Sequence, residues 1–142
     1  IRSGAAFEAL VRMTAAQGGD TAVLYDAANF PQARMQRTIT ADADGYLTRL
    51  DAEAVGRTAV LLGAGRMTKE SAINHAAGII LHKKYGDTVT EGAPLATLYA
   101  ESEEQIAAGA ERFRAAFEIG SAAPAPMKLI YGVVDAEGWH ER

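Results

Sequence analysis

Apolar residues at helical spacing mark the first element of the chain. Phe7, Leu10 and Val11 fall on one face of a helix that we expect from about residue 5 to 16. The glycine-containing run 17–20 ends this helix. A stretch of little periodicity follows, with turn-favouring Asn and Pro residues, and it predicts a loop.

Alternating apolar and polar positions then predict strands. The first covers residues 34–41 and the second covers residues 46–50. Between them lies Asp42-Ala43-Asp44-Gly45, whose Asp and Gly residues tolerate the backbone of a tight turn. The short connection predicts that these two strands pair as a hairpin.

A second helix is expected immediately after this pair. Asp51 is a candidate N-cap, and Leu50 and Val55 flank it at the spacing of a hydrophobic staple. The helix should run to about Leu62 and stop at Gly63-Ala64-Gly65. The following stretch, residues 68–77, fits either a short helix or a loop.

The second half of the chain contains further strands and the most clearly marked helix. Residues 78–83 and 95–99 are β-like, with turns at 85–87 and 91–92 between them. Ser102 and Gln105 match a capping box. The buried stripe of the helix that follows is expected to consist of Ile106, Ala110, Phe113 and Phe117.

A small linker at 122–126 and a final strand at 129–134 complete the predicted order of elements. Strands thus alternate with only two or three helices after the first one. This mixture predicts the α+β class rather than a doubly wound parallel sheet.

Composition narrows the classes of function. A chain of 142 residues fits one domain, and its net charge of −4 provides no electrostatic footprint for nucleic acid or an anionic membrane. Cysteine is absent, which excludes disulfides and thiolate chemistry, and no apolar run approaches the roughly 20 residues of a membrane helix. We therefore expect a cytoplasmic protein. The start at Ile1-Arg2-Ser3-Gly4 lacks an initiator Met and a signal-like stretch, so it is either added sequence or the interior of a longer protein.

The residues that could carry chemistry do not assemble into a complete site. His75, His82 and His140 show neither helical i, i+4 spacing nor an H-E-x-x-H pattern, so no metal site is predicted. We expect His82 on the outer face of a strand and His140 on a mobile tail. No catalytic residue and no metal ligand is assigned.

One glycine-rich loop is the strongest local candidate for function. Gly63, Gly65 and Arg66 could cradle a phosphate, but the pattern follows a helix and is neither G-x-G-x-x-G nor a P-loop. A glycine helix stop followed by a loop is the favoured interpretation. Lys69 and Glu70 lie beside it, and a solvated turn is favoured there over a buried catalytic amine.

A segment further on resembles biotinyl and lipoyl carrier domains. Residues 83–95 contain Gly86-Asp87, Val89, Gly92 and Leu95 in the order G-D-x-V-x-x-G-x-x-L. Carrier domains also display a modified Lys on an upstream hairpin, and Met67-Thr68-Lys69 breaks that pattern. The segment therefore predicts a barrel-sandwich-hybrid-like β core with flanking helices more than it predicts a swinging cofactor.

The same residues and their neighbours resemble the C-terminal part of the pyrimidine-nucleoside phosphorylases, the thymidine phosphorylase family. Asn74 departs from the family pattern, which usually carries Asp after Ile73. The matching stretches occur in family order over nearly the whole chain: 17–20, 44–46, 62–66 with 69–70, 78–79, 84–89, Gly92 and 129–131.

The resemblance implies a parent enzyme that cleaves a pyrimidine nucleoside with phosphate, giving the free base and a pentose 1-phosphate. It implies phosphate as co-substrate, no other cofactor, and a homodimer. The catalytic K-H-S-T-G-G-V-G-D-K signature is not in this chain. Residues 1–20 would then be the connecting helix from a missing α/β domain, and residues 21–142 would be the C-terminal α+β domain.

Three hypotheses follow for this chain. It is an accessory domain, inactive alone, whose partners are the missing N-terminal helical and α/β domains. Alternatively, it is a carrier domain modified at Lys69, or a protein–protein interaction module. Under the first, the loop from Gly63 to Glu70 is the best candidate to face the cleft of the parent enzyme and to become ordered when the cleft closes.

Overall fold

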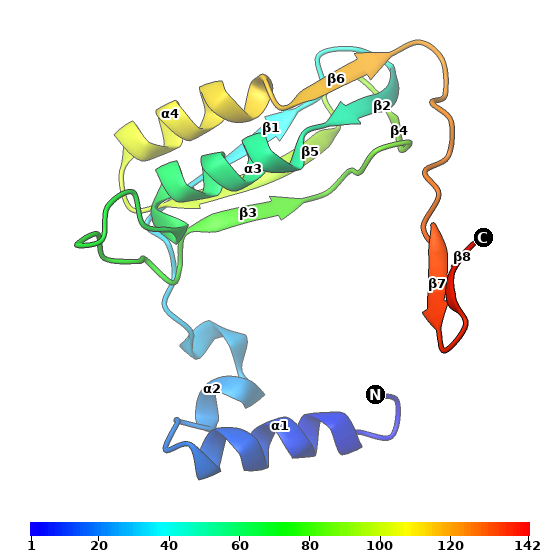
Figure 1. Cartoon of the computed structure of the whole chain (residues 1–142). Coiled ribbons are helices and arrows are strands. Elements are labelled where there is room, and N and C mark those ends of the chain that lie inside the picture. The colour runs from blue at the N-terminus through cyan, green and yellow to red at the C-terminus, as the bar shows by residue number, and fades with distance from the viewer.

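A computed structural model describes all residues from 1 to 142 (Figure 1). Antiparallel pairing builds three small sheets, with strand orders β1-β5-β3, β4-β2-β6 and β7-β8. Helices and strands are mixed along the chain, in the manner of an α+β domain. In chain order the elements are α1 (Ala5–Ala16), α2 (Ala22–Tyr25), η1 (Ala27–Asn29), β1 (Met35–Thr40), β2 (Gly45–Leu50), α3 (Ala52–Ala59), η2 (Val60–Ala64), β3 (Gly78–Leu81), β4 (Thr88–Val89), β5 (Pro94–Ala100), α4 (Glu103–Arg114), β6 (Phe117–Gly120), β7 (Gly132–Asp135) and β8 (Gly138–Glu141).

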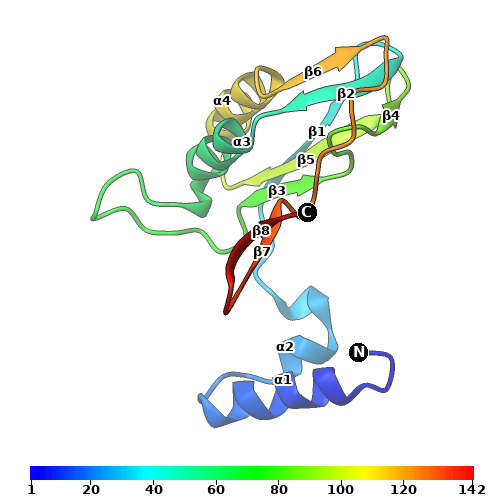
Figure 2. The same ribbon diagram turned by 45° about the vertical axis from the view of Figure 1, so that its right-hand side comes forward.

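The main core lies between the β1-β5-β3 sheet and the helices α3 and α4. Both helices cover the same face of this sheet in Figures 1 and 2. β5 is the central strand, and its alternate residues Ala96, Leu98 and Ala100 point into the core with no exposed surface. The helices contribute Ile106 and Phe113, which are almost fully buried because their spacing keeps them on one face of α4.

Two helix starts follow the local sequence signals. The Asp51 side chain accepts a hydrogen bond from the Ala54 N–H at 3.0 Å, which makes it the N-cap of α3. At α4, the Ser102 side chain accepts from the Gln105 N–H, and the Gln105 side chain accepts from the Ser102 N–H. The predicted N-cap and capping box are therefore confirmed.

The predicted hairpin between the first two strands is wrong. β1 pairs with β5, where Thr38 lies opposite Thr97, and β2 pairs with β4 and β6 in the other three-stranded sheet. The connection 41–44 carries the chain from one sheet to the other, and the Ala41 N–H donates to the Ala93 carbonyl across it. The chain does change direction at these Asp and Gly residues. However, β1 and β2 each pair with strands that are distant in the sequence and not with each other.

Several other boundaries differ from the predictions. α4 ends at Arg114, so Phe117 begins β6 and packs against the core as a strand residue. The final strand begins at Gly132 rather than Leu129, and β8 pairs with it. The predicted loop after residue 20 contains the short helices α2 and η1. The stretch 68–77, which fitted either a helix or a loop, forms no helix.

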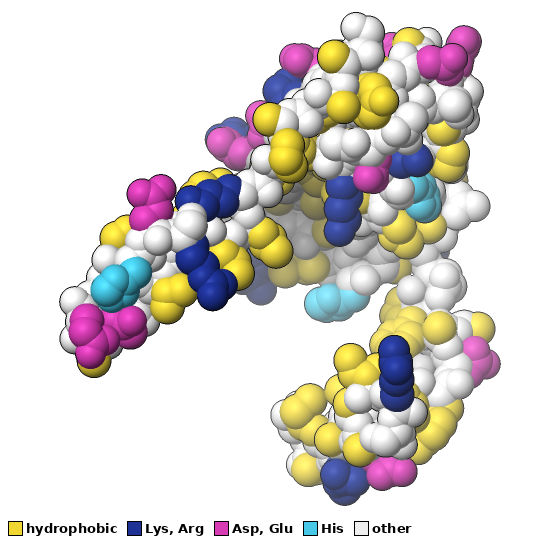
Figure 3. Space-filling model, turned by 90° about the vertical axis from the view of Figure 1, so that its right-hand side faces the viewer, with side chains coloured by type: hydrophobic (Ala, Val, Ile, Leu, Met, Phe, Trp, Pro, Cys, Tyr) yellow, Lys and Arg dark blue, Asp and Glu magenta, His cyan; other side chains and the backbone are white.

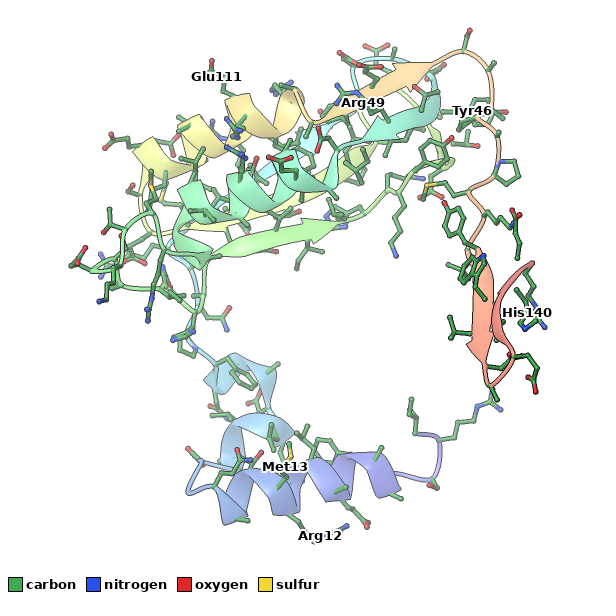
Figure 4. All side chains as sticks on the ribbon, viewed as in Figure 1. Arg12, Met13, Tyr46, Arg49, Glu111 and His140 are labelled. Carbon is green, nitrogen blue, oxygen red and sulfur yellow. The ribbon has the colours of Figure 1, made fainter.

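The N-terminal helices and the C-terminal hairpin extend away from the core (Figures 1 and 3). α1 forms as predicted, but none of its residues is buried. Its Phe7 ring packs edge to face on the Tyr25 ring of α2, with the ring centroids 5.3 Å apart. Figure 4 shows Met13 and Arg12 on opposite sides of α1. The division at residue 20 stays a prediction.

The sheets do not close into a barrel. A second, smaller cluster of Ala41, Val89 and Leu95 joins them, with Phe117 and Ile119 packed against it. The likeness of this core to a barrel-sandwich hybrid stays a prediction.

Candidate functional site

The glycine-rich loop starts where α3 loses its regular geometry. After Ala59 the chain widens into a π-turn, η2, which ends because Gly63 adopts φ +106° and ψ 1°. A side chain would be strained in this left-handed conformation, so the glycine determines where the helix stops. The Gly63 carbonyl accepts a hydrogen bond from the Asn74 N–H at 2.9 Å, which ties the two ends of the loop together.

Gly65 is required for a different reason. Its backbone is extended, but a Cβ atom placed there would lie 2.7 Å from a methyl carbon of Val60. The chain therefore leaves η2 by passing directly over the Val60 side chain. The predicted glycine helix stop is therefore confirmed. Gly63 and Gly65 are both needed for the conformation of the backbone at this point.

Two local turns shape the remainder of the loop. The Ser71 hydroxyl accepts from the Thr68 N–H at 3.0 Å, and the Ser71 N–H donates to the Thr68 carbonyl at 3.1 Å. At the far end, the Asn74 side chain accepts from the Ala76 N–H at 2.9 Å. Asn74, the position that departs from the family pattern, thus has a structural role in the turn that leads into β3.

The charged residues of the loop are exposed and make no ion pair. Arg66, Lys69 and Glu70 form neither a salt bridge nor a side-chain hydrogen bond, and Figures 1 and 2 show the loop extending beyond the helices. Lys69 and Glu70 lie in the exposed outer turn. Nothing in this loop activates a nucleophile or positions a general base.

Arg66 differs from its neighbours because the fold brings it to a pocket. The pocket has a volume of about 350 Å³ and lies where the loop meets α3 and α4. Two further arginines line it, Arg57 of α3 and Arg112 of α4. Sequence reasoning missed both, because they are 55 residues apart and only the packing of the two helices brings them to one place.

Two of the three histidines, His82 and His140, make ordinary polar contacts. No group of three or more His, Asp or Glu side chains is arranged to hold a metal ion. His82 follows β3 directly, is exposed, and its Nε2 lies 2.8 Å from the Thr97 hydroxyl. His140 lies in β8 (Figure 4), and its Nε2 lies 2.9 Å from the Asp135 carboxylate. The mobility of the tail around His140 stays a prediction.

Asp135 is the one group whose pKa departs clearly from its ordinary value. Loss of surrounding water alone would raise the pKa of Asp135. Hydrogen bonds, chiefly from the Glu137 backbone and the His140 side chain, lower the pKa by more, so the net pKa is lowered. The carboxylate is therefore stabilised as a structural group of the β7–β8 hairpin.

A family model matches residues 46–120, which is the region from β2 through β6 and includes the glycine-rich loop. The model is that of the pyrimidine nucleoside phosphorylase C-terminal domain. This chain belongs to that family. The recognition made from the sequence motifs is confirmed.

Curated relatives of this C-terminal domain carry the same family name. A pyrimidine-nucleoside phosphorylase of Bacillus subtilis is 41% identical over 137 residues, which cover 94% of this chain and 30% of that protein. Another from Geobacillus stearothermophilus is 43% identical over 104 residues, which cover 73% of this chain and 24% of that protein. The chain thus spans less than a third of the length of these relatives.

The match does not cover every element of the structure. The elements from α1 through β1 and the β7–β8 hairpin lie outside residues 46–120. None of the helices is long and apolar enough to cross a membrane.

Proposed function

We propose that this chain is the C-terminal domain of an enzyme that splits a pyrimidine nucleoside with phosphate, releasing the free base and a pentose 1-phosphate. The observation that supports this most strongly is the family match over residues 46–120, together with relatives that bear the enzyme's name. Phosphate would be the co-substrate, and no other cofactor is needed.

The role of this domain in that enzyme would be accessory. The residues described above include no activated nucleophile, no metal cluster and no complete catalytic arrangement. We therefore assign the chemistry to the N-terminal helical and α/β domains of the same protein. The C-terminal domain would support the cleft that these domains form.

Two exposed apolar surfaces would provide the attachment. A 12-residue helix such as α1 and an isolated two-stranded hairpin such as β7–β8 are both marginal in water without a packing partner. On α1, Phe7, Leu10 and Met13 are 40%, 39% and 52% exposed, and on the hairpin Val134 and Trp139 are 74% and 61% exposed. In Figure 3, apolar side chains border the hollow between these two parts and the core.

The loop from Gly63 to Glu70 would face the cleft and become ordered when the cleft closes. Its exposed Arg66, Lys69 and Glu70 have no partner within this domain, so they are free to meet another part of the enzyme. Loops that close over active sites commonly carry few packing contacts of their own.

Three further properties belong to the same proposal. The enzyme would be a homodimer, whose contacts lie mainly in the helical domain. It would be cytoplasmic, in keeping with a cysteine-free chain. The two packed sheets of the core would correspond to a barrel-sandwich hybrid with flanking helices.

The direct test compares two proteins in one assay. The full-length protein and the 142-residue chain are each incubated with uridine or thymidine and phosphate, and base release is followed by absorbance. We expect turnover by the full-length protein and none by the chain alone. Absence of turnover with both nucleosides in the full-length protein, or robust turnover by the chain, would overturn the proposal.

The role of the loop needs a separate measurement in the full-length enzyme. Lys69→Ala and Arg66→Ala should change kcat or KM, and Arg12→Ala on the exposed side of α1 provides a charge-matched control. If kcat and KM for both substrates are unaltered in the loop variants, the loop does not reach the cleft.

A further inference from the structure

Three guanidinium groups from three separate elements border one pocket. Arg57 comes from α3, Arg66 from the glycine-rich loop and Arg112 from α4. The other lining residues are Val60, Leu61 and Met67, all apolar. The pocket is open to solvent, and its volume of about 350 Å³ is near the lower end of the roughly 300–1,000 Å³ typical of small-molecule sites.

The positive charge of this pocket is largely uncompensated. Arg57 is held by Glu53 at 2.7 Å, but neither Arg66 nor Arg112 has a carboxylate within 4.0 Å. Such a cluster is unexpected in a chain whose net charge is −4. Like charges gathered at one site repel each other, and a bound anion would relieve that repulsion.

Apart from Glu53, the acidic residues near this pocket make no ion pair with its arginines. Glu101 pairs with Arg34 and Glu103 pairs with Arg37, both at the β1 side of α4. Glu111 lines a neighbouring pocket that shares Leu61 and Arg112 with this one, and Glu104 lines another that shares Leu61 and Met67. In Figure 4, Glu111 extends from the outer side of α4. Neither Glu104 nor Glu111 forms a salt bridge with Arg66 or Arg112, so these two arginines remain available to an external anion.

Ordinary structural roles account for only part of the cluster. Arg57 and Arg112 both lie in the last turn of their helices, where a cation interacts favourably with the helix dipole. Arg66 has no such role, because it belongs to an irregular loop. Gly65 extends the chain across Val60 and thereby brings Arg66 to the pocket.

We propose that this pocket binds a small organic phosphate. The planar guanidinium fork matches phosphate oxygens in two-point hydrogen bonds, and several arginines around one pocket are typical of phosphate recognition. The phosphate would lie among Arg57, Arg66 and Arg112. The apolar portion of the ligand would lie on Leu61 and Met67. This proposal shares Arg66 with the loop proposed above to face the cleft, but its test measures ligand binding and does not require turnover.

The test uses the full-length protein and three probes in a phosphate-free buffer. AMP carries both a phosphate and a flat aromatic base, adenosine lacks the phosphate, and inorganic phosphate lacks the base. We expect AMP to bind more tightly than adenosine in isothermal titration calorimetry. Inorganic phosphate, the proposed co-substrate, also reports binding at the catalytic site. The affinity should fall with added salt, because the contacts are charged and exposed.

Substitutions of the arginines test whether AMP binds in this pocket. Arg66→Ala and Arg112→Ala should each weaken AMP binding by about tenfold or more, since each removes a charge-assisted contact. Arg112→Lys should weaken AMP binding less than Arg112→Ala does, because lysine keeps the positive charge but lacks the planar guanidinium group. The matched control is Arg114→Ala, on the same helix but lining a different pocket, which should leave the affinity unchanged.

Two results would overturn this site. One is the absence of AMP binding at millimolar concentration, which would leave the arginines as contacts to another part of the protein. The other is AMP binding of equal strength in the parent, Arg66→Ala and Arg112→Ala proteins, which would place the ligand elsewhere. Neither result depends on whether the enzyme turns over a nucleoside, so the two proposals fail separately.

Discussion

Gly109 of α4 lies directly against the side chain of Leu62. A Cβ atom at Gly109 would be 2.6 Å from Cδ2 of Leu62, closer than carbon atoms pack. Leu62 belongs to η2 and is completely buried, so it has little room to move. The absence of a side chain at Gly109 is therefore what allows α4 to approach the end of α3.

This contact predicts opposite effects for two Gly→Ala substitutions. Gly56 lies inside α3, and a methyl group added there would meet no other atom within 4 Å. Gly56→Ala should therefore stabilise the chain by about 0.5–1 kcal/mol through helix propensity. Gly109→Ala gains the same propensity but overpacks the core, which costs about 1–3 kcal/mol, and we expect a net loss of about 1 kcal/mol.

Urea unfolding of the two variants and the parent chain measures this difference. The midpoint should rise for Gly56→Ala and fall for Gly109→Ala, with little change in the slope. If Gly109→Ala is as stabilising as Gly56→Ala, the helices are not in the close contact that the structure shows. A double variant with Leu62→Ala should relieve the overpacking and identify Leu62 as its source.

The capping box supports a second prediction. Ser102→Ala removes the oxygen that accepts from the Gln105 N–H and should cost about 1 kcal/mol of stability. Ser102→Thr keeps a hydroxyl and serves as the control. Because Ser102 and Gln105 act on each other, the cost of Ser102→Ala and Gln105→Ala together should be less than the sum of the two. Additive losses in thermal or urea unfolding would contradict a reciprocal box.

Local signals were sufficient to predict how the helices begin but not how the strands pair. Asp51 and Ser102 cap helices through residues three positions away, so the information lies within one turn. β1 and β5 pair although more than fifty residues separate the paired positions, and neither sequence contains a signal that identifies the other strand as its partner. The hairpin prediction assumed that β1 pairs with β2, because the connection between them is short. β1 instead pairs with β5, and this pairing completes the buried sheet under α4.

The candidate site shows the same limit. Gly63, Gly65 and Arg66 are adjacent in sequence and could be recognised as one loop. Arg57 and Arg112 could not be joined to it, because their meeting depends on how α3 packs on α4. Each of these arginines looks locally like a cation placed at a helix end.

A third prediction concerns Lys69. It lies in an exposed turn closed by Thr68 and Ser71, and no β-hairpin presents it. Carrier lysines are recognised on a hairpin tip, so we expect no covalent cofactor on this residue. Intact mass spectrometry of the purified chain should give the unmodified 15.0 kDa polypeptide. A heavier species that disappears in Lys69→Arg would revive the carrier hypothesis.

The fourth prediction is an acid transition of the β7–β8 hairpin. Asp135 has a pKa below its ordinary value of 3.8, because hydrogen bonds from the Glu137 backbone and the His140 side chain outweigh the opposing loss of water. A lowered carboxyl pKa in the folded state adds stability that is fully present above about pH 4. It is lost as the pH falls through the folded pKa.

Trp139 provides the measurement, since it is the only tryptophan and lies in β8. Its ring covers Gly132 on the paired strand, so separation of the strands should change its fluorescence. We expect the change below about pH 4 in the parent chain. In Asp135→Asn the hairpin should be weaker at neutral pH and lack this acid step. An identical acid step in the variant would show that a group other than Asp135 controls the hairpin.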